Sequence, residues 1–181
     1  MKKTLSLVIL LLVAIAPLLD AQGIGWGIVN AKIHHEFPDV PRMQTSELAD
    51  QLSNSKEQKP VLLDVRTKAE FDVSHLAGAT RIEPGADVTK LSLPKDKPIV
   101  TYCSVGYRSA ALAKKLREAG YTHITNLEGS IFRWANENRP LVHDGQPTDK
   151  VHPYNGLWGT LVEKTHRAVN PPPAEPTKSG P

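Results

Sequence analysis

The sequence is very poor in cysteine, and Cys103 is the only one in 181 residues. A single cysteine excludes an internal disulfide, so this thiol is either free or paired with another molecule. Clusters of histidine, cysteine and glutamate at metal-ligand spacing are also lacking, because the adjacent His34 and His35 have no second group of ligands beside them in the sequence. We therefore expect no metal site and no cofactor, and we interpret the two histidines as a solvated pair in a loop.

An excess of charge of one sign is lacking as well. The chain has 22 lysine and arginine residues and 19 aspartate and glutamate residues. Without residues 1–21, which contain two lysines and one aspartate, 20 basic residues stand against 18 acidic ones, a net charge of +2. This balance argues against a nucleic-acid partner. Length and composition are those of one globular domain, apart from prolines that cluster late in the chain.

The apolar run near the N-terminus falls short of the roughly 18 residues expected of a membrane-spanning helix. It covers residues 5–19, follows Lys2 and Lys3, and ends at Asp20. This is the pattern of a signal peptide over residues 1–21, which implies export to the periplasm or the extracellular space. Residues 23–29 are also fairly apolar, so an uncleaved anchor is the alternative, and only then would a membrane be a partner.

The cysteine lies where a strand is predicted to end and a helix to begin. Residues 98–102 have the length and β-branched content of a buried strand, and residues 109–119 are predicted to form a helix that stops at Gly120. The turn between them consists of Cys103, Ser104, Val105, Gly106, Tyr107 and Arg108. Backbone N–H groups at such a turn, with the positive end of the helix dipole, form a cradle for anions. A thiol there should have a lowered pKa and react as a thiolate.

The spacing of Cys103 and Arg108 restricts the chemistry further. Four residues separate them, whereas a cysteine phosphatase loop has five between its cysteine and its arginine in order to wrap a tetrahedral phosphate. In this chain, the position of that phosphatase arginine is occupied by Ser109. The shorter loop forms a tighter ring of N–H groups around the sulfur, which suits a persulfide better than a phosphate. Gly106 allows the sharp turn without a Cβ clash. Phosphatase or arsenate reductase activity is therefore disfavoured.

Other motifs accompany this loop, in order and at separate places in the chain. They lie at residues 62–66, 70–71, 74–79, 103–108, 126–130, 134 and 140–141. Together they resemble the rhodanese family of sulfurtransferases, in its single-domain form. The resemblance implies a three-layer α/β fold, with a five-stranded parallel sheet between helices. We divide the chain into residues 1–21 (signal peptide or anchor), 22–41 (irregular), 42–143 (rhodanese domain) and 144–181 (an arm and a flexible proline-rich tail).

The predicted secondary structure agrees with this fold. Apolar runs predict strands at residues 61–65, 80–82 and 121–127, and helical spacing predicts helices at 45–52 and 130–138. Residues 67–70 form a capping box that opens another short helix. Alternation of strands and helices predicts a parallel sheet covered on both faces.

Two charged residues near the first of these strands are assigned to the surroundings of the site. Asp64 is close to the carboxyl end of the strand, where open α/β sheets place their sites. It either holds neighbouring loops by accepting hydrogen bonds or caps the next turn, and both interpretations stay open. We assign Arg66 to an internal ion pair, and we favour a structural role for His75 over that of a general base. Residues 151–159 are expected to pack on the domain rather than present Tyr154 and Trp158 to a partner.

The resemblance implies sulfur transfer in two steps. The Cys103 thiolate attacks a small sulfur-containing anion such as thiosulfate, and a thiol, cyanide or protein acceptor then removes the sulfur from the Cys103 persulfide. The amides of residues 104–108 stabilise the anionic sulfur. Arg108 either holds the loop and makes the local field more positive, or contacts the donor anion directly. Ser104 stands where many active relatives carry arginine or lysine, which leaves the pocket less positive. The alternatives are an exported persulfide carrier or redox partner protein, and a binding module with an inert cysteine. Transfer requires an accessible sulfur with the loop amides directed at it, so a sulfur walled off from solvent, or amides turned away from it, would overturn the transferase assignment.

Overall fold

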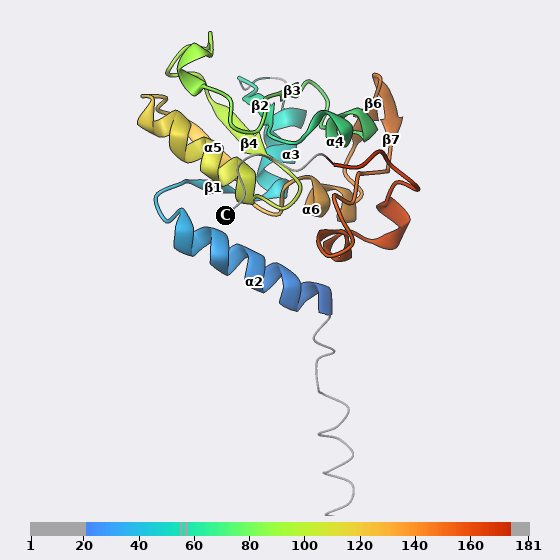
Figure 1. The fold of residues 1–181 in the computed structure, drawn as a ribbon. Helices are drawn as coiled ribbons and strands as arrows, with labels where there is room; N and C mark the ends of the chain where they lie inside the picture. Colours follow the sequence, from blue (N-terminus) through green and yellow to red (C-terminus); the bar gives the residue numbers. More distant parts are fainter. Residues whose placement is uncertain (1–20, 55, 57, 175–181) are drawn as a thin grey trace, which may run out of the picture.

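The computed structural model describes residues 21–54, 56 and 58–174 (Figure 1). Its helices are α2 (Ala21–Glu36), α3 (Thr45–Ser53), α4 (Lys68–Val73), α5 (Tyr107–Glu118) and α6 (Ser130–Asn136). The strands are β1 (Arg42–Met43), β2 (Val61–Asp64), β3 (Thr80–Arg81), β4 (Ile99–Tyr102), β5 (Ile124–Leu127), β6 (Leu141–His143) and β7 (Gln146–Thr148). Single 3-10 turns are η1 (Val88–Lys90), η2 (Trp158–Leu161) and η3 (Lys164–His166). The predicted signal peptide lies outside the described residues up to position 20, as does the end of the predicted tail from position 175.

The main sheet has five strands in the order β1-β5-β4-β2-β3, and every neighbouring pair is parallel. Successive side chains of a strand point to opposite faces, so Leu62 and Leu63 of β2 enter two different apolar clusters. Leu63 packs in the cluster that contains Leu112 of α5, and Leu62 packs in the cluster that contains Ile131 of α6. Helices therefore cover both faces of the sheet, which confirms the predicted three-layer α/β fold.

The strand register brings two loops together at one edge of the sheet. Asp64 at the end of β2 pairs with Tyr102 at the end of β4. Because parallel strands place their carboxyl ends at the same edge, the segment after β2 and the loop after β4 are neighbours. The loop that begins at Cys103 is therefore adjacent to α4.

The prediction that residues 22–41 are irregular is wrong, since α2 extends over most of that segment. Its three glycines at positions 23, 25 and 27 weaken the intrinsic helix propensity. Trp26, Val29 and Ile33 nevertheless lie on one face at helical spacing and are buried in the core. Tertiary packing of this apolar face outweighs the low propensity. His34 and His35 consequently lie on a helix rather than in a loop.

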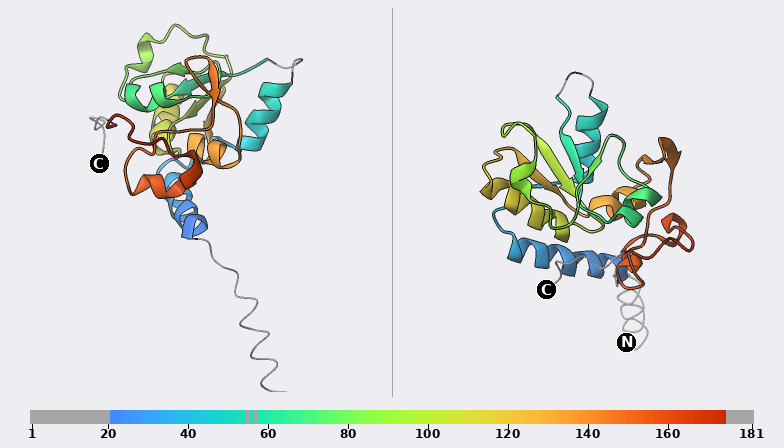
Figure 2. Two further views of the ribbon diagram at one scale, coloured as in Figure 1. Left: turned by 90° about the vertical axis from the view of Figure 1, so that its right-hand side faces the viewer. Right: turned by 45° about the horizontal axis from the view of Figure 1, so that its top comes forward.

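Helix α2 and the C-terminal arm pack together at one end of the domain (Figure 2). The arm comprises residues 144–174 of the described chain, and its Val151, Leu161 and Val162 belong to the same buried cluster as Trp26. A Cβ on Gly25 would lie only 2.8 Å from Leu161 Cδ2, so these segments approach closely and a larger residue there would displace the Leu161 side chain. Tyr154 and Trp158 pack against this cluster, as expected. Within the described residues, no helix is both long and apolar enough to span a bilayer.

Candidate active site

The loop after β4 is shaped by hydrogen bonds that engage its own carbonyl groups. The amides of Ile131 and Phe132, in the first turn of α6, donate to the carbonyl oxygens of Cys103 and Ser104 at 3.2 and 3.1 Å. Ser130 Oγ accepts the N–H of Cys103 at 3.1 Å. Gly106 turns the chain with φ 110°, in a region that L side chains rarely adopt, and α5 begins at the next residue. Helix α5 therefore starts two residues before the predicted position.

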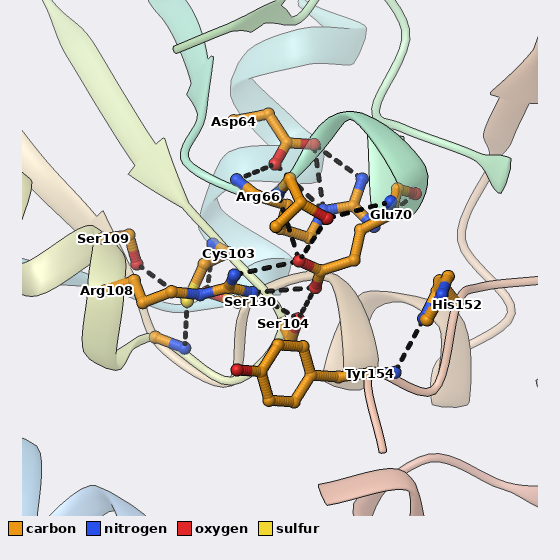
Figure 3. A network of polar contacts seen from close by, with 12 residues as sticks. Asp64, Arg66, Glu70, Cys103, Ser104, Arg108, Ser109, Ser130, His152 and Tyr154 are labelled. Atoms are coloured by element: carbon orange, nitrogen blue, oxygen red, sulfur yellow. Dashed lines mark hydrogen bonds and ion pairs between the residues drawn. The ribbon is translucent and has the colours of Figure 1, made fainter. Parts of the chain in front are cut away.

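Gly106 of the loop and Ser109 of α5 contact the sulfur of Cys103 (Figure 3). The Gly106 N–H donates to Sγ at 3.2 Å, and Ser109 Oγ lies 3.6 Å from Sγ. Ser109 Oγ also lies 2.6 Å from Asn126 Oδ1. A hydroxyl has one proton, and the shorter contact with the amide oxygen is the stronger of the two. The backbone N–H of Gly106 is therefore the firmer donor to the sulfur.

The electrostatic surroundings favour the ionised form of Cys103. Burial raises the pKa of this thiol, because a charged sulfur loses its hydration. The positive charge of Arg108 and the N–H groups of Ser109 and Gly106 act in the opposite direction and outweigh burial, so the pKa is lowered from its usual value. This is the shift expected of a nucleophilic cysteine at the start of a helix.

Arg108 is held by a carboxylate from α4 rather than directed toward an open pocket. Its Nη1 and Nη2 donate to Glu70 Oε2 and Oε1 at 2.9 and 2.8 Å, and Nη2 also contacts Ser104 Oγ at 2.9 Å. Ser104 Oγ in turn donates to Glu70 Oε1 at 2.6 Å. Burial would raise the pKa of Glu70, but the hydrogen bonds and charge of Arg108 lower it to about 2. Of the two roles considered for Arg108, this geometry favours holding the loop.

Asp64 and Arg66 form a second ion pair, and neither side chain is exposed to solvent. Arg66 Nη2 lies 2.6 Å from Asp64 Oδ2, and its guanidinium also donates to the carbonyl oxygens of Glu70 and Ser74. Asp64 Oδ1 accepts the backbone N–H of Arg66 at 3.0 Å. Asp64 thus performs both roles considered for it, and Arg66 is an internal ion-pair partner. Arg66 thereby anchors the last turn and the C-cap of α4, the helix that supplies Glu70.

Val105, Tyr107 and His75 lie in three different surroundings. Val105 is buried among apolar side chains of α2 and the arm, so its side chain is a core residue. Tyr107 is half-buried at the start of α5. The His75 ring stacks on Phe71 with 3.9 Å between ring centroids, and its Nδ1 lies 3.2 Å from the Phe71 carbonyl oxygen. These contacts are those of a structural residue.

Four residues at the site were not identified from the sequence. They are Glu70, Ser109, Asn126 and Ser130. Glu70 was recognised only as the last residue of a capping box, a role that it also has. The sequence did contain a signal for this pairing: Glu70 follows β2 and Arg108 follows β4, and the carboxyl ends of parallel strands meet at the same edge of the sheet. Asn126 and Ser130 carry no comparable local signal, because their roles depend on the register between β4 and β5.

The expectation of a solvent-accessible sulfur is wrong in this conformation. Cys103 is only 1% exposed, and the next three residues of the loop are also buried. Ile33 of α2 lies beside Gly106, and its Cδ1 would be 3.4 Å from a Cβ at that position. Tyr154 of the arm lies over the guanidinium of Arg108, 5.0 Å from ring centroid to Cζ. The loop that surrounds the sulfur is therefore covered by segments that flank the predicted domain, whereas Cys103 itself packs in the apolar cluster of β2, β4 and α5. An N–H donor remains directed to the sulfur.

Comparison with known proteins agrees with these features. The family model of the rhodanese-like domain matches residues 45–137. A sulfurtransferase of Allochromatium vinosum is 30% identical over 104 residues, which cover 57% of this chain and 95% of that protein. A probable adenylyltransferase/sulfurtransferase, MoeZ of Mycobacterium tuberculosis, is 35% identical over 99 residues, covering 52% of this chain but only 24% of MoeZ.

A solved structure provides the corresponding comparison of folds. The rhodanese-like domain protein of Staphylococcus aureus superimposes with a TM-score of 0.51 and 25% identity, covering 58% of this chain and 99% of that one. The matched family model spans half of the chain and includes the loop, Glu70 and both ion pairs. This chain is a member of the rhodanese-like domain family.

Proposed function

We propose that this protein is a sulfurtransferase in which Cys103 carries the transferred sulfur as a persulfide. The observation that carries the proposal is the Gly106 N–H directed at Cys103 Sγ, in a loop where Arg108 lowers the thiol pKa. The family assignment and the sulfurtransferases among its relatives support the same activity. The buried sulfur requires that reactants approach through the cover described above.

The chemistry consists of two displacements at sulfur. In the first, the Cys103 thiolate attacks the outer sulfur of a sulfane donor such as thiosulfate. A Cys103 S–S bond forms, the donor S–S bond breaks, and sulfite leaves with the electron pair. In the second, a thiol or cyanide attacks the outer sulfur of the persulfide, and the Cys103 thiolate leaves. The loop N–H groups stabilise the anionic sulfur in both steps.

The donor is proposed to be small and anionic, although the site is less positive than one with a free cation beside the cysteine. The Ser104 hydroxyl donates a hydrogen bond to Glu70 and accepts one from Arg108. Glu70 offsets much of the charge of Arg108. Thiosulfate is therefore expected to bind weakly, while persulfide formation itself stays possible because it depends on the loop amides.

A persulfide carrier or redox partner protein is the second candidate function. The burial of Cys103 favours it, because a covered persulfide would be protected from water and oxidants. We further propose that either function is performed outside the cytoplasm, since residues 1–21 have the pattern of a signal peptide. Mass analysis of the mature protein from cells would show whether the N-terminal segment has been removed.

Intact-mass measurement on the reduced protein tests sulfur transfer directly. After treatment with thiosulfate, the wild type should gain one sulfur atom, lose it on addition of cyanide, and turn over in the presence of both reagents. The Cys103→Ser variant is the matched control and should gain nothing. A stable mass increase without turnover would favour the carrier. No added sulfur from thiosulfate or from a persulfide donor would reject both functions and leave a binding module.

A further inference from the structure

The cover over the active loop is built from parts of the chain that flank the family match. Cys103 and the three residues after it are buried, whereas Tyr107 and Arg108 are partly exposed, with 16% of the Arg108 side chain accessible. A reactant that approaches Cys103 therefore passes beside these two residues. The segments next to them are α2, before residue 45, and the arm, after residue 137.

Helix α2 forms the fixed side of this approach. Phe37 packs edge-on against Tyr107 with 5.5 Å between ring centroids, and Glu36 accepts a hydrogen bond from the Tyr107 hydroxyl. Lys32 lies 5.4 Å from the centroid of the Tyr107 ring. The buried Trp26 and the other core residues of α2 attach this helix to the domain along its length. Movement of α2 would expose that apolar surface to water, which is unfavourable.

Tyr154 forms the opposite side and is attached by far fewer contacts. Its ring stacks over Arg108 and is only half-buried, and Figure 3 shows the ring beside Ser104 and Arg108, with the hydroxyl directed toward the side of Cys103. The Tyr154 backbone has φ 64°, a conformation that costs energy for a bulky residue. His152 Nδ1 accepts the Tyr154 N–H at 2.9 Å and fixes this turn. Leu157, in the same segment, is 75% exposed.

We infer that Tyr154 is a gate and a specificity-determining residue for the Cys103 site. Its ring narrows the approach beside Arg108, so that small sulfane anions and small thiophiles such as cyanide reach the sulfur, while bulky thiols and protein cysteines are excluded. Side-chain rotation of Tyr154 breaks the cation–π contact with Arg108 and the packing of one half-buried ring, whereas displacement of α2 would break a core. The arm thus selects the substrate by size. This inference rests on the proposed sulfur transfer for its biological meaning, but the accessibility of the thiol can be measured without turnover.

The test compares two alkylating reagents on reduced protein. Rate constants are measured for iodoacetamide and for a fluorescein-linked maleimide, and their ratio cancels any change in the thiolate fraction of Cys103. In Tyr154→Asn, the ratio of the bulky to the small reagent should rise by about fivefold or more, the factor that corresponds to loss of one cation–π contact. Asparagine is chosen because it tolerates positive φ. Tyr154→Phe should keep the wild-type ratio, and Leu157→Ala is the control in the same segment.

The outcomes separate this inference from the proposed function. An unchanged ratio in a folded Tyr154→Asn variant would overturn the gate. If that variant does not fold, Tyr154→Gly, which also accepts positive φ, decides the question. A higher ratio in a protein that never takes sulfur from thiosulfate would support the gate and reject the transferase. When transfer does occur, Tyr154→Asn should also accelerate sulfur delivery to glutathione relative to cyanide, and equal acceleration of both acceptors would contradict size selection.

Discussion

Glu70 and Arg108 are joined by two hydrogen bonds of 2.9 and 2.8 Å, although 38 positions separate them in the chain. The first residue comes from α4, after β2, and the second from the start of α5, after β4. The pair ties the active loop to a helix that Arg66, paired with Asp64, holds at the carbonyl oxygens of Glu70 and Ser74. Loop geometry and domain stability therefore depend on these four charges, and only that of Arg108 also stabilises the thiolate.

Replacement of Arg108 should raise the pKa of Cys103. In the wild type, the pH at which alkylation by iodoacetamide is half-maximal should lie below the value of about 8.5 for a free cysteine. Arg108→Gln removes the positive charge and should raise that midpoint by about one pH unit. Arg108→Lys keeps the charge without the planar fork and should raise it less. A wild-type midpoint at or above that of a free thiol would contradict the proposed stabilisation.

Glu70 should make the domain less stable in acid. Its pKa is about 2 in the folded protein, whereas a free glutamate has a value of 4.5, so the charged form is favoured by folding. The corresponding stabilisation, about 3 kcal/mol, is complete above pH 4.5 and is lost as the pH falls toward 2. Glu70→Gln should be less stable than the wild type at pH 7, and the difference should narrow below pH 4. Urea unfolding of both proteins across this range is the measurement, and a constant difference would argue against an ion pair.

Gly106→Ala should damage the site more than a glycine change elsewhere. At φ 110°, an alanine is strained, and its Cβ would meet Ile33 and the Leu127 carbonyl at 3.4 and 3.5 Å. We expect a loss of stability of about 1–2 kcal/mol and a large loss of sulfur transfer. Gly78→Ala is the matched control, because Gly78 also has positive φ (77°) and no neighbour within 4 Å of its Cβ position. If Gly106→Ala keeps as much sulfur-transfer activity as Gly78→Ala, the loop tolerates a side chain at position 106.

The packing of α2 can be tested at two positions on opposite faces. Trp26 is 8% exposed and Ile28 is 67% exposed. Trp26→Ala should cost about 3–5 kcal/mol, as for large-to-small changes in a core, and should increase the reactivity of Cys103 toward alkylation. Ile28→Ala should change stability by less than about 0.5 kcal/mol. Thermal unfolding midpoints would distinguish a core helix from a loosely attached one.

Asp64→Asn should destabilise the domain without changing the chemistry of the thiol. It leaves the fully buried Arg66 without its carboxylate, which costs about 3–5 kcal/mol. Asp72→Asn is the control, since the exposed pair of Lys68 and Asp72 contributes about 0.5 kcal/mol or less. The alkylation midpoint of Cys103 should stay within error of the wild type in both variants, because neither residue contacts the sulfur.

Much of the domain followed from local patterns in the sequence. Apolar runs located β2, β3, β4 and β5, a capping box located the start of α4, and the spacing of Cys103 and Arg108 located the loop. The short strands β1, β6 and β7 were not predicted. Helix α2 was missed because its glycines lower the local propensity, whereas its stability comes from contact with Leu161 and other distant residues. Glu70 was assigned to a cap because its second partner, Arg108, is remote in the chain.

The order of residues alone determined that a strand would end at Cys103 and that a tight turn and a helix would follow, because these features depend on neighbours a few positions apart. It also determined that the strands would be parallel, because strands and helices alternate along the chain. Only the tertiary structure decided which carboxylate holds Arg108, which groups contact the sulfur, and that α2 and Tyr154 lie over the loop that surrounds it. Those outcomes depend on strand register and on packing between segments that are distant in the chain, which no local pattern encodes.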